Sequence, residues 1–434
     1  MRLTSIAQLR LPFGRLYGYD VAVSSPAGAL PLSFDQRRHV GVGERPGAWM
    51  GVSFRLAETL SKDDLAAAWL AVIARHGTLR SVVDPGDGDG PRLHQVHVGA
   101  GRWVEHPIGA GQAVEAAVRD VFDRRCTPFS TPSHRICVLE TAAGPTVIVA
   151  ADHTHVDMWS MLVIVRDLVA ALRGTHDGAG PVLPPAPDFA EHTRALTDRP
   201  AAPEDVRRRW AEIMHVGAGG MPVFPLPLGP SAPHPERVEV RDVLGTAACA
   251  ALAESARAAG VSTLTSAVSA MTAVTAELAG SALRAVFPVH SRHDDAWHDS
   301  VGWFITNSVL ESGDPEPGAC ARAVKAAVRL GSYPLEELLR PWGGMPATPG
   351  MFAISWLDLR RLPVRVPPEC LDMHYVGASI ATDGVMLWFI LDESGLHLRC
   401  RYPDTHEARA NVGAWLDAVV LRLQASARAP QPQP

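Results

Sequence analysis

The stretch Val147–Ser160, VIVAADHTHVDMWS, decides the fold, because it joins a strand, a polar turn and a helix within a few residues. The run 146–150 is apolar, which predicts a strand buried on both faces. From Ser160 to Leu172 apolar side chains recur at every third or fourth residue, which predicts a helix with Arg166, Asp167 and Arg173 on its other, exposed face. His153 and Asp157 stand between these elements. A strand end presents reactive side chains from a rigid support, so this turn is the candidate site.

Helix and strand signals alternate in both halves of the chain around this turn. In the first half we expect a helix over 61–76 and a strand over 135–140. In the second half we expect strands over 237–243, 284–288, 351–356, 385–391 and 396–402, and helices over 262–278, ended by Gly280, and over 408–423. A further Pro- and Gly-rich stretch, 217–235, predicts a long surface loop.

The stretch Gly174–Pro187, GTHDGAGPVLPPAP, separates the two halves. Its glycines and prolines cannot continue the preceding helix and predict an extended connector. The sequence therefore predicts an α/β protein (α+β sandwich lobes) with an N-terminal lobe at 1–175, a linker at 176–190, a C-terminal lobe at 191–428 and a disordered tail at 429–434.

Composition limits the function classes. The chain has 434 residues, 47% of them hydrophobic, which suffices for a full core and excludes a disordered chain. Its 40 Lys and Arg against 46 Asp and Glu give no basic excess, so we expect no nucleic-acid partner. No apolar run approaches the roughly 20 residues of a membrane span, and the N-terminus carries no apolar targeting segment. Six scattered cysteines without a CxxC pair predict reduced, buried thiols, so we expect a cytoplasmic protein.

The turn itself supports three interpretations. A histidine held at a strand end accepts a proton near neutral pH, so His153 is a candidate base. Asp157 would then hold the turn, either through backbone N–H groups or through an arginine. The simplest alternative is a polar loop with one hydrogen-bonded histidine.

A metal site is the third interpretation. The pattern His153-x-His155-x-Asp157 looks like the HxHxD core of di-metal hydrolases, and His290, His293 and His298 offer further ligands. The fuller HxHxDH pattern requires a histidine where Met158 stands, and no CxxC or HExxH accompanies it. We therefore expect no metal.

Taken together, the motifs point to one superfamily. Asp152–Ser160 resembles HHxxxDG(W)S, the signature of nonribosomal peptide condensation domains and related acyltransferases of the chloramphenicol-acetyltransferase-like superfamily. Other stretches resemble that family's motifs in the family's order: Leu32–Arg38 (LSxxQxRxW), Arg75–Arg80 (RHExLR), Pro187–Glu191 (YxDFA), Phe287–Arg292 followed by Val301–Phe304 (PVxxR…VGxFVNT), and Ser355–Asp358 (the SYLD-type strand of the polyketide-associated acyltransferase branch). They span roughly residues 30 to 425, nearly the whole chain.

The resemblance implies two chloramphenicol-acetyltransferase-like lobes that form a V-shaped pseudo-dimer with a central tunnel. His153 matches the motif histidine that faces the tunnel and acts as general base, or that holds the acceptor and stabilises the tetrahedral intermediate. Asp157 matches the structural aspartate, which pairs with an arginine that maps to Arg292 in the other lobe. The resemblance also places a set of side chains along the substrate tunnel: Met158, Trp159, Trp303, Asn307 and Ser355.

The sequence departs from the family pattern at three positions. Asp152 replaces the first histidine, where it would bond loop backbone groups or raise the pKa of His153. Met158 replaces the glycine that lets a phosphopantetheine arm approach, and would narrow or reshape the donor path. Asn307 is shifted by one residue from its place in the VNT motif.

The resemblance implies a free-standing bacterial acyltransferase of specialised metabolism. It would join an acyl thioester, on an acyl or peptidyl carrier protein met in trans or on CoA, to an amine or alcohol acceptor. No cofactor would be tightly bound, since phosphopantetheine or CoA arrives as part of the donor. The alternative is a condensation-like domain that has lost the chemistry and acts as a binding or recruitment module, with Asp152 and Met158 as signs of that loss.

Overall fold

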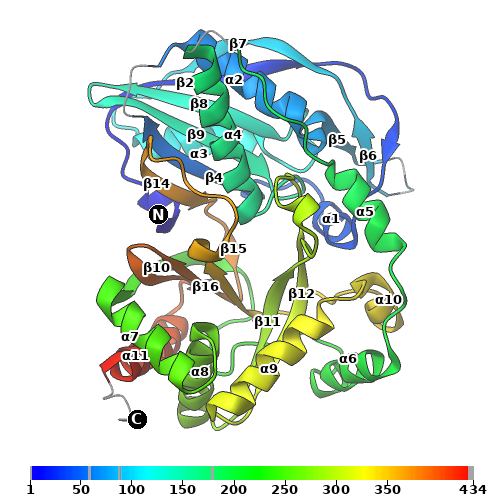
Figure 1. The fold of residues 1–434 in the computed structure, drawn as a ribbon, viewed down its shortest axis with the longest axis vertical. Coiled ribbons are helices and arrows are strands. Elements are labelled where there is room, and N and C mark those ends of the chain that lie inside the picture. The colour runs from blue at the N-terminus through cyan, green and yellow to red at the C-terminus, as the bar shows by residue number, and fades with distance from the viewer. Residues whose placement is uncertain (1, 57–59, 87, 89, 177–179, 429–434) are drawn as a thin grey trace. The chain divides into compact units, whose positions relative to one another are not determined.

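The computed structural model describes residues 2–56, 60–86, 88, 90–176 and 180–428 (Figure 1). They form two compact units that are not continuous in sequence. Unit 1 comprises Met1–Asp198, Arg292–Ile305 and Leu362–Ser379, and unit 2 comprises Arg199–Ser291, Thr306–Arg361 and Ile380–Pro434. Three segments that the predicted division assigned to the C-terminal lobe, 191–198, 292–305 and 362–379, thus belong to unit 1. The division into lobes that are continuous in sequence stays a proposal. The predicted tail, 429–434, lies outside the described residues.

Unit 1 is built on one large sheet. Its strands are β1 (Arg2–Ser5), β2 (Gly14–Val23), β4 (Trp49–Leu56), β7 (Val98–His106), β8 (His134–Thr141), β9 (Gly144–Asp152) and β14 (Cys370–Gly377), in the order β1-β14-β4-β9-β8-β2-β7. The central strand β9 is buried over most of its length, as its apolar composition predicts. The helices of this unit are α1 (Phe34–Val40), α2 (Lys62–Arg75), α3 (Val114–Arg125), α4 (Met158–His176) and α5 (Phe189–Thr197).

A smaller sheet completes unit 1. It holds β3 (Ala29–Leu30), β5 (Ser81–Asp84) and β6 (Arg92–Gln95), in the order β3-β6-β5. These strands and α1 enclose a small apolar cluster around Val40, Val83 and Leu93.

Strand β14 enters the large sheet from far along the chain. It pairs in parallel with β1 and antiparallel with β4, more than 300 residues away in sequence. No local pattern signals such a pairing, because strand alternation specifies which face a side chain takes but not which strand lies beside it.

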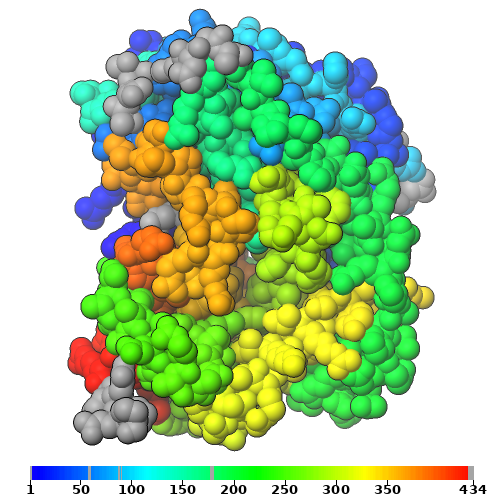
Figure 2. Space-filling view, in the orientation of Figure 1, coloured from blue at the N-terminus to red at the C-terminus, as the bar shows by residue number. Residues whose placement is uncertain are grey.

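Unit 2 is a second sheet with helices packed on one face. Its strands are β10 (His234–Gly245), β11 (Leu283–His290), β12 (Ile305–Ser312), β13 (Phe352–Asp358), β15 (Ala381–Thr382), β16 (Val385–Asp392) and β17 (Gly395–Pro403), in the order β12-β11-β13-β16-β17-β10-β15. Its helices are α6 (Glu204–Val216), α7 (Thr246–Ala258), α8 (Thr263–Ala279), α9 (Pro317–Leu330), α10 (Leu335–Leu339) and α11 (His406–Arg428). Figure 2 shows α8 and α9 side by side on the surface of this unit.

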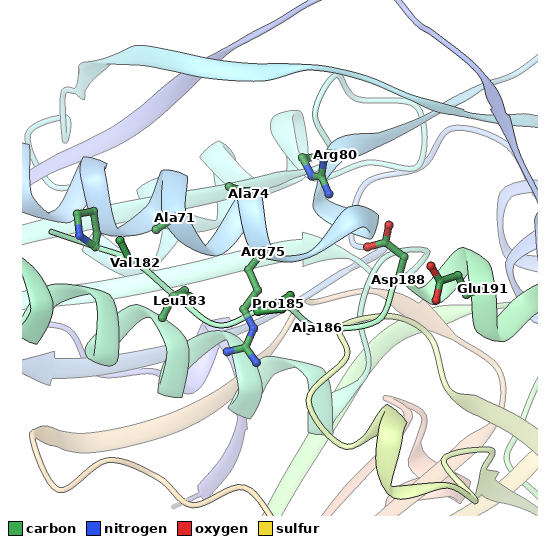
Figure 3. A pocket seen from close by; sticks show the side chains of 11 residues that line it. Ala71, Ala74, Arg75, Arg80, Val182, Leu183, Pro185, Ala186, Asp188 and Glu191 are labelled. Atoms are coloured by element: carbon green, nitrogen blue, oxygen red, sulfur yellow. The ribbon is translucent and has the colours of Figure 1, made fainter.

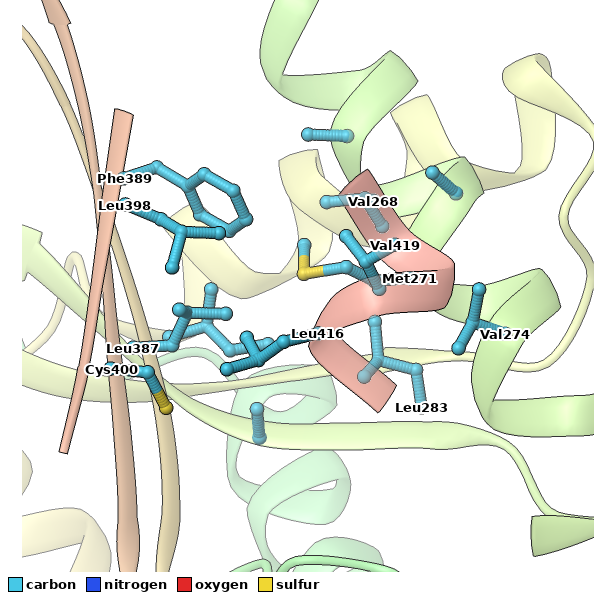
Figure 4. Close-up of a cluster of buried hydrophobic side chains, with 14 of the residues drawn as sticks. Val268, Met271, Val274, Leu283, Leu387, Phe389, Leu398, Cys400, Leu416 and Val419 are labelled. Carbon is cyan, nitrogen blue, oxygen red and sulfur yellow. The ribbon is translucent and has the colours of Figure 1, made fainter. Parts of the chain in front are cut away.

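The core of unit 2 is apolar. Leu387, Phe389, Leu398 and Cys400 point from the sheet toward Met271 and the other apolar side chains of α8 and α11 (Figure 4). A strand contributes to such a core only with alternate residues, so the residues between them take the opposite face of the sheet.

Most predicted elements are confirmed within a few residues, including the left-handed Gly280 that ends α8. The prediction that the chain leaves the helix at Gly174 is wrong, because α4 continues to His176. The predicted surface loop 217–235 buries Met221 and Phe224, so part of it belongs to the core. All six cysteines are buried and unpaired, as predicted.

Candidate functional site

The motif turn, residues 152–160, connects β9 to α4. His153 is anchored by its backbone N–H, which donates to the Ala48 carbonyl at 3.0 Å. Asp157 precedes the first turn of α4, and its Oδ1 accepts from the Ser160 N–H at 2.7 Å. An aspartate there caps the helix, because it satisfies an N–H group that has no partner within the helix.

Asp157 and Arg292, which the resemblance pairs, lie together. Arg292 Nη2 is 3.4 Å from Asp157 Oδ1, and both side chains are almost fully buried. Arg292 also donates to the Trp297 and Ser300 carbonyls, at 2.5 and 2.7 Å. Burial lowers the pKa of Arg292, and Asp157 opposes that shift, so the pair stabilises the charged guanidinium.

The segment 292–305 is hydrogen-bonded to the motif turn at several further points. Ser160 Oγ donates to the Gly302 carbonyl at 2.8 Å and accepts from the Gly302 N–H at 3.0 Å. The Phe304 N–H donates to Asp157 Oδ2 at 3.0 Å. Trp159 Nε1 donates to the His298 carbonyl at 3.1 Å. The Asp157–Arg292 pair therefore lies within unit 1, and the expectation that it joins the two lobes is corrected, because 292–305 packs into the compact unit that holds the turn.

Two glycines let three of the motifs approach one another. A Cβ on Gly302 would lie 2.4 Å from the Phe189 ring, and a Cβ on Gly77 would lie 2.2 Å from Asp188 Oδ1. The Gly77 N–H donates to that same oxygen at 2.8 Å. The glycines of the RHGTLR and VGWF stretches are thus required by close contact with the PDFAE stretch.

His153 packs against Trp303. The two ring centroids are 4.0 Å apart at an interplanar angle of 35°, and the His39 ring is centred 6.2 Å from the His153 ring. Burial first, and then the neighbouring His39, lower the pKa of His153 to about 4, although Asp152 and Asp157 act to raise it. His153 is therefore a neutral imidazole at neutral pH, with its ring plane fixed by Trp303. Its Nδ1 has no hydrogen-bond partner among the described residues.

Asp152 is fully buried. Together with His39 and Arg45 it forms a series of hydrogen-bonded side chains that the sequence analysis missed. His39 Nε2 lies 3.1 and 3.2 Å from the two oxygens of Asp152, and His39 Nδ1 lies 2.8 Å from Arg45 Nη2. Arginine only donates, so Nδ1 accepts and Nε2 carries the proton that is donated to Asp152. His39 thus links the guanidinium of Arg45 to the carboxylate of Asp152.

Asp152 also organises the turn. Its Oδ1 accepts from the Thr154 N–H at 2.8 Å and from the Thr154 hydroxyl. Burial acts to raise the pKa of Asp152, but these bonds and the bond from His39 outweigh it, and its pKa is lowered. Of the two effects expected of this residue, the backbone bonds are present. It does act to raise the pKa of His153, but burial outweighs it.

The remaining predicted residues divide between the units. Met158 begins α4, and its carbonyl accepts from the Tyr375 hydroxyl at 2.7 Å. Trp159 lies 5.0 Å from the Arg292 guanidinium in a cation–π contact. Asn307 on β12 and Ser355 on β13 belong to unit 2. Whether these residues line a tunnel stays a prediction.

A second buried polar cluster lies near the start of the RHGTLR motif. Asp167 of α4 is 2.8 Å from His76 Nε2 and 2.9 Å from Arg75 Nη1. The helical pattern predicts Asp167 on an exposed face, which is wrong, since only 1% of it is accessible. The motif's Arg-His pair is thus explained by a carboxylate buried on the neighbouring helix.

The candidate metal ligands of the sequence do not form a metal site among the described residues. Among the described residues no group of three His, Cys, Asp or Glu side chains is placed to hold a metal ion. His155 is buried with its Nδ1 3.5 Å from Ser81 Oγ, while His298 Nε2 pairs with Asp295 at 3.4 Å.

An open groove of about 520 Å³ lies apart from the motif turn (Figure 3). Ala71, Ala74 and Arg75 of α2 line one side, and the segment 181–188 lines the other. The second half of the predicted linker therefore packs on unit 1.

No single helix among the described residues is long and apolar enough to cross a membrane, although α7 and α8 together match a bent span by length and composition. A cytoplasmic location stays a prediction.

Comparison with known sequences finds two partial relatives, and no family model matches the chain. It is 29% identical over 215 residues to phosphinothricin tripeptide synthetase PhsC of Streptomyces viridochromogenes, covering 46% of this chain and 19% of that protein. It is 29% identical over 325 residues to isonitrile lipopeptide synthase of Mycobacterium tuberculosis, covering 68% of this chain and 12% of that protein. The chain thus spans less than a fifth of the length of either relative.

Comparison with solved structures identifies the fold. PapA2 acyl transferase superposes with a TM-score of 0.86 at 18% identity, over 99% of this chain and 100% of that one. The first condensation domain of the calcium-dependent antibiotic synthetase gives 0.71 at 16% identity, over 94% and 98%. The SgcC5 protein of Streptomyces globisporus gives 0.68 at 19% identity, over 92% and 99%. The predicted fold class is therefore confirmed: this chain has the fold of PapA2 acyl transferase and of condensation domains. The V-shaped arrangement and the central tunnel stay predictions.

Proposed function

We propose that this chain, which has the condensation-domain fold, is an acyltransferase that joins an acyl thioester to an amine or a hydroxyl acceptor. The observation that carries the proposal is His153, a neutral, buried imidazole held at the end of β9 and packed on Trp303. The fold and the partial synthetase relatives support the same reaction class.

In the proposed reaction the acceptor heteroatom attacks the thioester carbonyl carbon. His153 accepts the proton that the acceptor loses, and the tetrahedral intermediate then expels the thiolate. The proton passes to the thiolate sulfur, so the products are the amide or ester and a free thiol. A neutral imidazole suits this role, because it has a lone pair at neutral pH.

The residues around His153 would position it. Trp303 restricts the ring plane, and the Asp157–Arg292 pair fixes the turn on which His153 stands. Orientation of this kind contributes to rate, because a base misplaced by about an ångström loses much of its effect. Met158 follows Asp157 at the start of α4, where we propose that it limits approach of the donor arm.

The decisive experiment is thiol release. Wild type and His153→Ala are offered acyl-CoAs, acyl-pantetheines and acyl-carrier proteins together with mixed small amines and alcohols. We expect release that needs both an acceptor and His153, with the variant slower by about 10²–10⁴-fold. The donor that works identifies carrier protein or CoA as the partner.

A matched control separates chemistry from folding. His134 is another buried histidine of unit 1, on β8, and its Nε2 lies 2.8 Å from the Leu79 carbonyl. We expect His134→Gln to keep thiol release while His153→Ala loses it. No release from any donor, together with retained binding of a carrier protein, would refute the acyltransferase and favour the recruitment module.

A further inference from the structure

The outer face of the unit 2 sheet carries two arginines that the proposed reaction does not use. On β17, the residues Leu396, Leu398, Cys400 and Tyr402 point into the apolar core. Strand alternation therefore places Arg399 and Arg401 on the opposite face, two residues apart. Arg399 is only 2% exposed, and the Arg401 side chain is 15% exposed.

Several guanidinium N–H groups of Arg399 and Arg401 have no hydrogen-bond acceptor among the described residues. Nε and Nη2 of Arg399 and Nε of Arg401 are buried and have no hydrogen-bond partner among the described residues. Arg401 Nη2 contacts the Met386 sulfur at 2.7 Å, which is a weak acceptor. Buried guanidinium donors normally find acceptors, so unpartnered ones indicate an acceptor that arrives from outside.

Charge near the pair is unbalanced. Among the described residues, the carboxylate that pairs with these two cations is that of Glu236. Its Oε2 lies 3.8 Å from Arg401 Nη1. Burial, and then repulsion from Arg401, lower the pKa of Arg399 to about 10, so it remains charged at neutral pH. One positive charge therefore stays uncompensated in a poorly solvated place, which is costly until an anion joins it.

The neighbouring strand β16 places the ring of Trp388 beside the two guanidiniums. The Arg399 and Arg401 guanidiniums lie 4.8 and 5.4 Å from the Trp388 ring in cation–π contacts. Trp388 pairs in register with Arg399 on one side and with Ser355 of β13 on the other. Trp388 and Ser355 are both partly exposed, so this row of the sheet leads from the buried arginine to accessible side chains.

We propose that Arg399, Arg401 and Trp388 form a binding site for an oxyanion group, namely a carboxylate, sulfate or phosphate. Two guanidiniums side by side offer the planar donor pairs that such a group accepts bidentately. Its assignment to a substrate rests on the proposed acyl transfer: the anion is then a phosphate of the donor or an acidic group of the acceptor. Binding itself does not depend on turnover.

The test is the thermal stability of the intact protein as a function of anion concentration. Sodium sulfate is titrated against sodium chloride of equal ionic strength, with wild type, Arg399→Gln and Arg399→Lys. We expect sulfate to raise the melting temperature of wild type with the logarithm of its concentration, and its affinity to fall at least about tenfold in both variants. Arg237→Gln is the matched control, since Arg237 is 46% exposed on the adjacent strand and faces the other side. It should keep the sulfate effect.

A second readout distinguishes a ligand site from a purely structural arginine. In chloride buffer without oxyanions, we expect Arg399→Gln to be at least as stable as wild type, because it removes an uncompensated buried charge. Equal sulfate effects in wild type and both variants, or loss of stability in the variant without any sulfate effect in wild type, would overturn the proposal.

Further arms of the titration identify the source of the anion. Stabilisation by CoA but not by phosphate-free pantetheine would assign the site to the donor. Stabilisation by sulfate and by small dicarboxylates, with CoA no better than sulfate, would assign it to an acidic acceptor. Because both arms measure binding, failure of thiol release would leave their outcome intact.

Discussion

Both units bury apolar side chains, but they differ in the charged and polar side chains that they enclose. Unit 1 encloses imidazoles, carboxylates and guanidiniums around the motif turn, for example His153, Asp157 and Arg292. Unit 2 encloses a continuous apolar core between its sheet and α8 and α11. Apolar burial is non-directional, whereas each buried polar group in unit 1 requires a partner at a defined distance. The difference indicates that unit 1 is specified for positioning a reactive group and unit 2 mainly for stability, with Arg399, Arg401, His397 and Asp392 as charged or polar side chains that its sheet brings together.

The largest expected effect is on the ion pair of unit 1. We expect Arg292→Ala to lower the free energy of unfolding by about 3–5 kcal/mol, because it leaves Asp157 as an uncompensated buried charge. Chemical denaturation against wild type and His153→Ala measures this loss. His153→Ala should cost clearly less, and equal melting temperatures for the two variants would contradict the role given to the pair.

The core of unit 2 provides the apolar counterpart. Leu416 is fully buried among apolar side chains, so Leu416→Ala should cost about 2–5 kcal/mol through lost burial and a cavity. The cost should be the same at pH 7 and pH 5, because the cluster around Leu416 contains no Asp, Glu, His, Lys or Arg side chain. Denaturation at both pH values checks it, and a strong pH dependence would show that the comparison between the units is wrong.

Acid should weaken unit 1 through its buried histidines. Burial lowers the pKa of His134 to about 4, although its bond to the Leu79 carbonyl opposes that shift. A histidine in the unfolded chain has a pKa near 6.5. Above that pH the His134 ring is neutral in both the folded and the unfolded chain, so its contribution to the free energy of unfolding is fully present. As the pH falls toward 4, the unfolded chain takes up the proton first, so stability is lost by up to about 3 kcal/mol.

His134→Gln tests this dependence. Glutamine can still donate to the Leu79 carbonyl but does not titrate, so the loss of stability between pH 6.5 and 4 should shrink by about 2–3 kcal/mol. Unfolding midpoints of wild type and the variant across this range measure it. An unchanged slope would mean that His134 does not titrate in this way.

The smallest expected effect concerns the chain Arg45–His39–Asp152. In Arg45→Gln, His39 Nδ1 loses the guanidinium that holds its ring, so the contact between His39 and Asp152 is held less firmly. Because His39 acts on the motif turn only through Asp152, we expect thiol release to fall by less than about tenfold. Arg38→Gln is a control, since Arg38 is 37% exposed and is 4.0 Å from Asp35. Equal rates of thiol release in wild type and both variants would contradict this role of Arg45.

Much of the site could be predicted from local sequence, and some of it could not. The strand, turn and helix around His153 follow from hydrophobic period, and the capping by Asp157 follows from its place before α4. His39 was not predicted as a site residue, because it lies in α1 outside any recognisable motif. Its role depends on contact with Asp152, more than 100 residues away in sequence. Asp167 was misplaced because helical period marks a polar residue as exposed, whereas a buried carboxylate is permitted once His76 and Arg75 neutralise it.

By itself the sequence determined the elements, the motifs and the chemistry available at the turn, because hydrophobic period, capping and residue type act over a few neighbouring residues. Only the tertiary structure decided which distant segments meet. It inserted β14 beside β1, packed 292–305 against the motif turn, placed His39 on Asp152, and brought Trp388 against Arg399 and Arg401. These outcomes depend on strand order and on close contacts between remote segments, which the hydrophobic pattern of a single chain leaves open.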